Sequence, residues 1–304
     1  MGIDWKERED QLLQLLDKHR RKDGYYDCLV PGSGGKDSAY QAHILKYKYG
    51  MNPLTVTWAP HLYTDIGWKN MQEWMHTGGL DNMLYTPNGI LHKEMTKNAF
   101  HNLLHPFQPF IVGQRIIGPS LAAKFGVELV MYGENQAEYG NNVDDNYIPT
   151  MDRKFFSISD PLDIVLGGKK IRDIIEETDF TFNDFAPYIP PSADYLESKN
   201  VEVHYLGYYL KWDPQECYYY AAKNTGFRPN TDVRVLSKGS IQYQLSKQKF
   251  TKLPPRHILP LELKNLTEKF KELKSLVYEY KEKKENEINN LNVEQKKLKI
   301  LLDK

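Results

Sequence analysis

A short glycine-rich segment, residues 33–38, carries the side chains with the clearest chemistry in this 304-residue chain. It reads Ser33-Gly34-Gly35-Lys36-Asp37-Ser38 and follows the apolar run Cys28-Leu29-Val30. Two adjacent glycines between hydroxyl side chains let backbone N–H groups converge on an anion, and a helix beginning near Asp37 would add its positive N-terminal end. The segment therefore predicts a phosphate-binding loop. It is not a Walker loop, because Lys36 lies between Gly35 and Asp37 instead of preceding a Ser or Thr.

The composition limits the class of protein. Lys plus Arg number 40 and Asp plus Glu number 40, so the formal net charge is +0 and the pI is about 7.1. This balance argues against a nucleic-acid partner, because such proteins usually present a basic face. With Cys28 and Cys217 as its two cysteines, the chain offers neither a disulfide framework nor a cysteine-based metal site, and a cytoplasmic location is expected. No membrane association is expected, because no run approaches about 18 apolar residues.

The spacing of apolar residues predicts strands that alternate with helices, which is typical of a doubly wound parallel sheet in the α/β class. In such sheets ligands bind beyond the carboxyl ends of the strands, where residues 33–38 and those after Tyr132 would lie. Gly118-Pro119 is expected to interrupt one helix, and residues 208–212 either continue the last strand or turn it. Strands are expected at residues 26–30, 53–58, 82–85, 128–132 and 201–206, and helices at residues 5–20, 37–49, 67–76, 90–104, 112–125 and 214–224.

The chain is predicted to have three parts. Residues 1–230 form the main domain, in which the loop-rich stretch 135–191 is expected to serve as a functional lid or a substrate loop. Residues 231–260 are a linker of uncertain structure, and residues 261–304 are rich in Lys and Glu with apolar residues three and four apart. That spacing predicts an amphipathic C-terminal helical extension and favours a surface or partner helix over a two-stranded coiled coil.

The order Ser-Gly-Gly-x-Asp-Ser resembles the PP-loop of ATP pyrophosphatases, which split ATP into AMP and pyrophosphate while adenylating an oxygen. The resemblance implies the adenine nucleotide alpha hydrolase-like fold, with ATP and Mg²⁺ as cofactors. It also implies that Asp37 orients the loop or the metal ion, whereas Lys36 occupies the family's variable position, where a contact with phosphate is plausible. The expected nucleotide-binding residues are Ser33, Gly34, Gly35, Lys36, Asp37, Ser38 and Thr57.

Further blocks narrow the resemblance. Residues 132–140, 188–191, 203–212 and 218–220 are similar to the N-acetyl sugar amidotransferase family, which makes acetamidino sugars for lipopolysaccharide O-antigen and flagellin glycans. The similarity covers roughly residues 5–230, and beyond them the family's usual tail is not recognisable. The family's activity would adenylate the acetamido oxygen of an N-acetyl sugar and replace it with ammonia.

Site residues follow from this resemblance and from their position after predicted strands. The candidate catalytic residues are Lys36, Asp37, Glu134 and Glu138, with Asp37 also the candidate metal ligand. The candidate substrate-binding residues are Gln114, Arg115, Asn135, Tyr208, Tyr209 and Lys211. Structural roles stay open for each group, since polar loops cap helices and tyrosines pack in cores.

Two other functions remain open at this point. One is a tRNA-modifying PP-loop enzyme, although the two cysteines are poorly placed for thiolation and no basic RNA platform is apparent. The other is a non-catalytic nucleotide-binding assembly protein. No Cys-His glutaminase arrangement is recognisable, so we expect a separate glutaminase subunit or free ammonium to supply ammonia. A homo-oligomer is compatible with the sequence.

Overall fold

A computed structural model describes residues 3–133 and 147–230. The chain divides into two units, Met1–Thr231 and Asp232–Lys304, and every described residue belongs to the first. Glu134, Asn135 and Glu138, the expected linker 231–260 and the expected helical tail 261–304 lie outside the described residues. Among the described helices, none has the length and apolar character needed to cross a membrane.

Five parallel strands form the central sheet, in the order β3-β2-β1-β4-β7. The chain starts at the central strand, winds outward on one side and then returns to add strands on the other side. The order therefore reverses between β1 and β4, which is the position where sheets of this kind bind ligands. The doubly wound parallel sheet expected from the sequence is confirmed. The strands are β1 (Cys28–Pro31), β2 (Pro53–Trp58), β3 (Asp81–Tyr85), β4 (Leu129–Tyr132) and β7 (Glu202–Tyr205).

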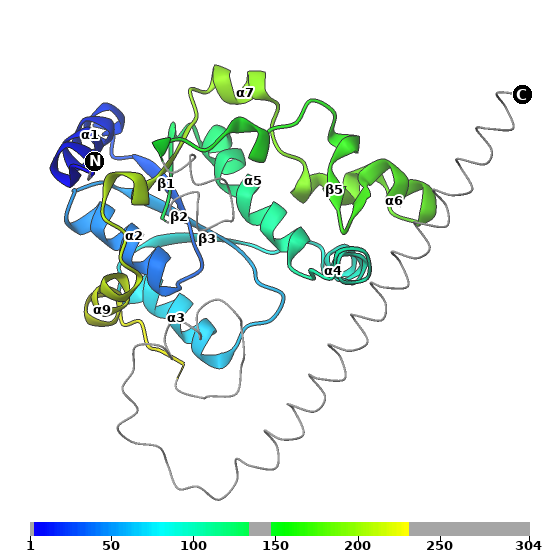
Figure 1. Cartoon of the computed structure of the whole chain (residues 1–304), viewed down its shortest axis with the longest axis horizontal. Helices are drawn as coiled ribbons and strands as arrows, with labels where there is room; N and C mark the ends of the chain where they lie inside the picture. The colour runs from blue at the N-terminus through cyan, green and yellow to red at the C-terminus, as the bar shows by residue number, and fades with distance from the viewer. Residues whose placement is uncertain (1–2, 134–146, 231–304) are drawn as a thin grey trace, which may run out of the picture. The chain divides into compact units, whose positions relative to one another are not determined.

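Helices cover both faces of the sheet, as Figure 1 shows. Side chains alternate along each strand, so Cys28 and Val30 pack on one face while Leu29 packs on the other. The first face is covered by α1 (Trp5–His19), α2 (Lys36–Tyr47), α3 (Asp65–His76) and α9 (Pro214–Asn224). The second face is covered by α4 (Gly89–Leu103) and α5 (Gln108–Phe125). The helices predicted in these regions are confirmed within a few residues.

Short elements lie between and after the main strands. The sequence did not predict α6 and α7, because helices of 7 and 6 residues carry little periodic signal. Residues 206–209 turn into a helix instead of continuing the last strand. These elements are η3 (Arg153–Phe155), η4 (Pro161–Asp163), the hairpin of β5 (Val165–Leu166) and β6 (Lys169–Lys170), α6 (Ile171–Glu177), η5 (Phe182–Tyr188), α7 (Ala193–Ser198) and α8 (Leu206–Tyr209).

Helix α5 runs unbroken through Gly118-Pro119, so the expected interruption was wrong. Pro119 has no N–H to donate to the carbonyl of Arg115, one helical turn earlier. The Tyr132 hydroxyl, from the last residue of β4, lies 3.0 Å from that carbonyl oxygen and donates to it. A side chain outside the helix thus satisfies the acceptor that the proline leaves open, which keeps α5 helical and joins it to the carboxyl end of the sheet.

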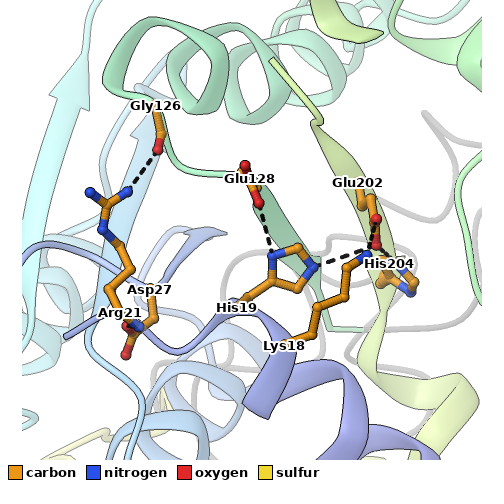
Figure 2. A network of polar contacts seen from close by, with 8 residues as sticks. All are labelled: Lys18, His19, Arg21, Asp27, Gly126, Glu128, Glu202 and His204. Atoms are coloured by element: carbon orange, nitrogen blue, oxygen red, sulfur yellow. Dashed lines mark hydrogen bonds and ion pairs between the residues drawn. The ribbon is translucent and has the colours of Figure 1, made fainter. Parts of the chain in front are cut away.

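The amino end of the sheet holds a network of polar contacts, drawn in Figure 2. His19, the last residue of α1, is buried with its ring nitrogens 3.6 Å from a Glu128 oxygen and 3.5 Å from a Glu202 oxygen. Lys18 also pairs with Glu202, and His204 lies 3.4 Å from the same carboxylate. These contacts join the end of α1 to the starts of β4 and β7.

Candidate functional site

A cavity of about 450 Å³ lies at the carboxyl end of the sheet. Its lining includes the last residue of four strands, namely Pro31, Trp58, Tyr132 and Tyr205. The predicted phosphate-binding loop forms another part of the wall through Ser33, Gly35, Asp37 and Ser38, and helix α5 adds Gln114 and Arg115. The structure therefore brings together residues from sequence segments more than 80 positions apart, at the place predicted for the ligand.

The loop between β1 and α2 is shaped by its glycines. Gly34 is buried and has a φ of +76°, a conformation that favours glycine. A Cβ atom on Gly34 would lie 2.7 Å from the Cα atom of Met71 in α3, so this glycine also lets the loop pack against a helix. The Ser38 hydroxyl accepts from the backbone N–H of Ser33 at 3.3 Å and donates to the Gly35 carbonyl at 3.1 Å. The loop is thus held in a fixed turn.

Helix α2 begins without a capping side chain. Asp4 and Thr64 accept hydrogen bonds from first-turn N–H groups of α1 and α3, whereas the N-cap of α2 is Gly35, which has no side chain to do so. First-turn N–H groups have no partner within their own helix, so they can bind an anion, and the helix dipole favours negative charge there. Because Gly35 also lines the cavity, the start of α2 offers these groups beside it.

Lys36 and Asp37 form an ion pair with 2.6 Å between the lysine nitrogen and a carboxylate oxygen. Asp37 lines the cavity, while Lys36 is not among the lining residues. Of the residues that the structure describes, no three His, Cys, Asp or Glu side chains converge as a metal site. One carboxylate nonetheless fits a Mg²⁺ ion that phosphate oxygens also coordinate, so Asp37 is the residue that would hold it.

Arg115 supplies positive charge to the cavity. Its guanidinium lies 5.2 Å from the centre of the Phe155 ring, which also lines the cavity. Among the described residues, no carboxylate forms an ion pair with Arg115, although many surface cations of this chain are paired. A half-buried guanidinium without a counter-ion is a natural partner for phosphate or carboxylate oxygens.

Trp58 was not predicted as a site residue. It is 2% exposed, lines the cavity, and its indole N–H has no hydrogen-bond acceptor among the described residues. A Cβ atom on Gly113 would lie 2.2 Å from the Trp58 ring, so glycine at this position of α5 makes room for the indole. A buried donor without an acceptor costs about 1–3 kcal/mol, so the Trp58 N–H is a polar group that the described fold leaves unsatisfied. The rule that ligands meet strand ends could have identified Trp58 and Tyr132.

Five other predicted residues are not among the lining of this cavity. Gly34 is buried and packs against Met71 of α3. Thr57 is buried, and its hydroxyl lies 3.1 Å from the Asn82 side-chain oxygen on β3. Tyr209 is also buried, and its hydroxyl lies 2.8 Å from Nδ1 of His204. Tyr208 and Lys211 line a second, smaller cavity. The binding roles predicted for these residues remain predictions.

No family model matches the sequence, and no curated protein matches it significantly. Solved structures do match, at low identity. They include a predicted subunit of tRNA methyltransferase from Methanocaldococcus jannaschii, at 15% identity with a TM-score of 0.35, covering 64% of this chain and 73% of that chain. NMN synthetase from Francisella tularensis matches at 15% identity with a TM-score of 0.36, covering 66% of this chain and 92% of that chain. NH3-dependent NAD synthetase from Campylobacter jejuni matches at 13% identity with a TM-score of 0.36, covering 78% of this chain and 100% of that chain.

Proposed function

We propose that this protein is an ATP-dependent enzyme of the PP-loop type, which cleaves ATP to AMP and pyrophosphate. The single observation that carries the proposal is the cavity at the carboxyl end of the sheet, where the loop of residues 33–38 meets four strand ends and Arg115. The uncapped start of α2 and the Arg115 guanidinium suit phosphate oxygens. The apolar wall, which includes Trp58, suits a base or sugar ring.

We further propose that the acceptor is the acetamido group of an N-acetyl sugar. An acetamido oxygen is a poor leaving group, so it must be activated before nitrogen can replace it. The carbonyl oxygen would attack the α-phosphorus, forming an O–P bond while the bond to pyrophosphate breaks. Ammonia would then add to the imidate carbon, AMP would leave with the oxygen, and an amidine would remain.

In this scheme the loop, Arg115 and Asp37 would act on the phosphates, and two acidic residues would act on ammonia. Ser33, Ser38 and the first-turn N–H groups of α2 would hold the pyrophosphate, and Arg115 would neutralise charge on the α-phosphate. Asp37 would hold Mg²⁺, which neutralises phosphate charge when bound. Glu134 and Glu138 remain the candidates for proton transfer to and from ammonia. A closed apolar wall would exclude water from the adenylated sugar.

The experiment is to measure pyrophosphate release with ATP, Mg²⁺, ammonium and a panel of N-acetyl sugars, while mass spectrometry follows the sugar. The proposal predicts AMP and pyrophosphate in equal amounts, released only with an acceptor, and a product in which oxygen has been exchanged for NH. Pyrophosphate release that depends on tRNA instead would support the tRNA-modifying alternative. ATP binding without turnover on any acceptor would favour the assembly protein, and formation of ADP would contradict the PP-loop assignment.

A further inference from the structure

A second cavity, of about 280 Å³, lies beside the start of α1 and the short helix α8. Aromatic rings and cations line it, and no carboxylate is among its described lining residues. The aromatic and cationic lining residues are Trp5, Arg8, Tyr147, Tyr208, Lys211 and Trp212. We propose that this cavity binds an oxyanion carried on a pyranose ring, such as a hexuronate or a hexose phosphate.

Arg8 is held in place from two directions. Its guanidinium carbon lies 3.4 Å from the centre of the Tyr208 ring, and its terminal nitrogen donates to the Tyr208 carbonyl at 3.2 Å. Arginine has five N–H donors, so most of them stay available for another acceptor. No ion pair joins Arg8 to any described carboxylate. A cation fixed by stacking loses little further freedom on binding, which favours a bidentate contact with a carboxylate or phosphate.

Lys211 adds a second cation to the same cavity. Its side chain is exposed, and in the described part of the chain it forms no ion pair. A flexible lysine and a fixed arginine together match an anion that carries one or two negative charges. No described acidic side chain lines the cavity to oppose them.

Aromatic side chains form much of the lining. The rings of Trp212, Tyr208, Trp5 and Tyr147 offer flat apolar surfaces for the C–H face of a pyranose. Because Trp212 belongs to the lining, a bound ligand would change the environment of its indole group. The lining thus combines contacts for an anion with contacts for a ring.

This site is distinct from the ATP cavity, although the two adjoin. The Gly207 N–H donates to the Gly133 carbonyl at 2.8 Å, and Gly207 lines the second cavity while Gly133 lines the first. Tyr208 and Lys211 were predicted from the sequence to bind substrate, whereas Arg8, Trp5 and Tyr147 emerge from the structure. The inference does not rest on the proposed function, because binding here requires neither ATP nor turnover.

The test is a titration of the full-length protein with glucuronate, glucose 6-phosphate and neutral glucose, by calorimetry and by the indole N–H signals in ¹H–¹⁵N spectra. We expect saturable binding of a charged sugar, a shift of the Trp212 indole signal and at least about 10-fold weaker binding of glucose. Preference for glucuronate identifies a carboxylate ligand, and preference for glucose 6-phosphate identifies a phosphate ligand. No saturation by either, or equal binding of glucose, would overturn the proposal.

Substitutions of single residues test whether the ligand binds in this cavity. Arg8→Gln is expected to weaken binding by about 10- to 100-fold, and Arg8→Lys by less, because it keeps the charge. Lys6→Gln is the matched control, since Lys6 is exposed on the same helix and does not line the cavity. Equal losses in Arg8→Gln and Lys6→Gln would mean a nonspecific charge effect. If Arg8→Gln lowers stability, the shift of the Trp212 signal in the wild-type protein still decides whether the ligand binds here.

Discussion

The polar groups at the two ends of the parallel sheet differ in whether the protein itself supplies their partners. At the amino end, Lys18 and His19 both face the carboxylate of Glu202, and His19 also faces Glu128 (Figure 2). At the carboxyl end, Arg115 has no counter-ion and Trp58 has no acceptor among the described residues. The first set lies within 3.6 Å of carboxylates inside the protein, whereas the second set lines a cavity.

This difference separates stability from binding. Paired groups hold the end of α1 against the starts of β4 and β7, so their loss should lower stability without touching a ligand. Unpaired groups at the cavity add little to stability, because their partners are absent in the free protein. Substitutions at the amino end should therefore change the free energy of unfolding, and substitutions at the carboxyl end should change the affinity for ATP.

The largest effect is expected from Gly34→Val. Gly34 belongs to the loop at the carboxyl end of the sheet and also packs against α3. The introduced side chain would meet the backbone of Met71 in α3 and would require a positive φ. We expect a loss of about 2–5 kcal/mol in the free energy of unfolding, measured with urea. The contact with α3 thus gives Gly34 a role in the fold as well as in the loop. Unchanged stability would mean that the loop does not pack on α3.

Arg115→Gln should affect binding alone. Loss of one charged contact to phosphate should weaken ATP binding by about 10- to 100-fold, with little change in the midpoint of urea unfolding. Arg153→Gln is the control, because Arg153 is an exposed arginine that pairs with Glu197 and does not line the cavity. Calorimetric titration with Mg·ATP measures both. Equal affinity of the two variants would remove Arg115 from the site.

Tyr132→Phe tests the bond that joins β4 to α5. Removing the hydroxyl leaves the Arg115 carbonyl without a donor, so we expect a loss of about 1–3 kcal/mol in unfolding free energy. Pro119→Ala restores a backbone N–H for that carbonyl, and in this background Tyr132→Phe should cost clearly less. A double-mutant cycle in urea measures the coupling. Equal costs in both backgrounds would show that the hydroxyl does not compensate for the proline.

The smallest effect concerns pH at the amino end. Burial lowers the pKa of His204, which faces Glu202, His19, Lys18 and Tyr209. A lowered pKa in the folded protein means that the unfolded chain binds more protons below about pH 6.5, so stability falls as the pH drops through that value. His204→Gln should flatten this part of the curve. A steeper curve in the variant, measured by urea unfolding between pH 7 and 5, would contradict the assignment.

The sequence predicted those parts of the site whose conformation depends on residues close together in the chain. The turn of residues 33–38, the strand Pro53–Trp58 and the helix Pro214–Asn224 were predicted within a few residues, because glycines, β-branched residues and caps act locally. Trp58 could not be identified as an unpaired donor, since only the packing of Gly113 against its ring fixes that environment. The burial of Tyr209 against His204 could not be predicted either, because it depends on the helical turn at residues 206–209.

The central claim is that the loop at the start of α2 binds the phosphates of ATP, and Gly35→Ala tests it most directly. A Cβ atom on Gly35 would have the Ser33 hydroxyl as its nearest neighbour, at 3.7 Å, so alanine fits and should cost less than about 1 kcal/mol of stability. The added methyl would keep phosphate away from the backbone. Gly89→Ala is the matched control, because a Cβ there meets no atom within 4 Å. In calorimetric titrations with Mg·ATP, we predict at least about 10-fold weaker binding for Gly35→Ala and wild-type affinity for Gly89→Ala. Wild-type affinity in both variants, or no binding of ATP to the wild-type protein, would contradict the account.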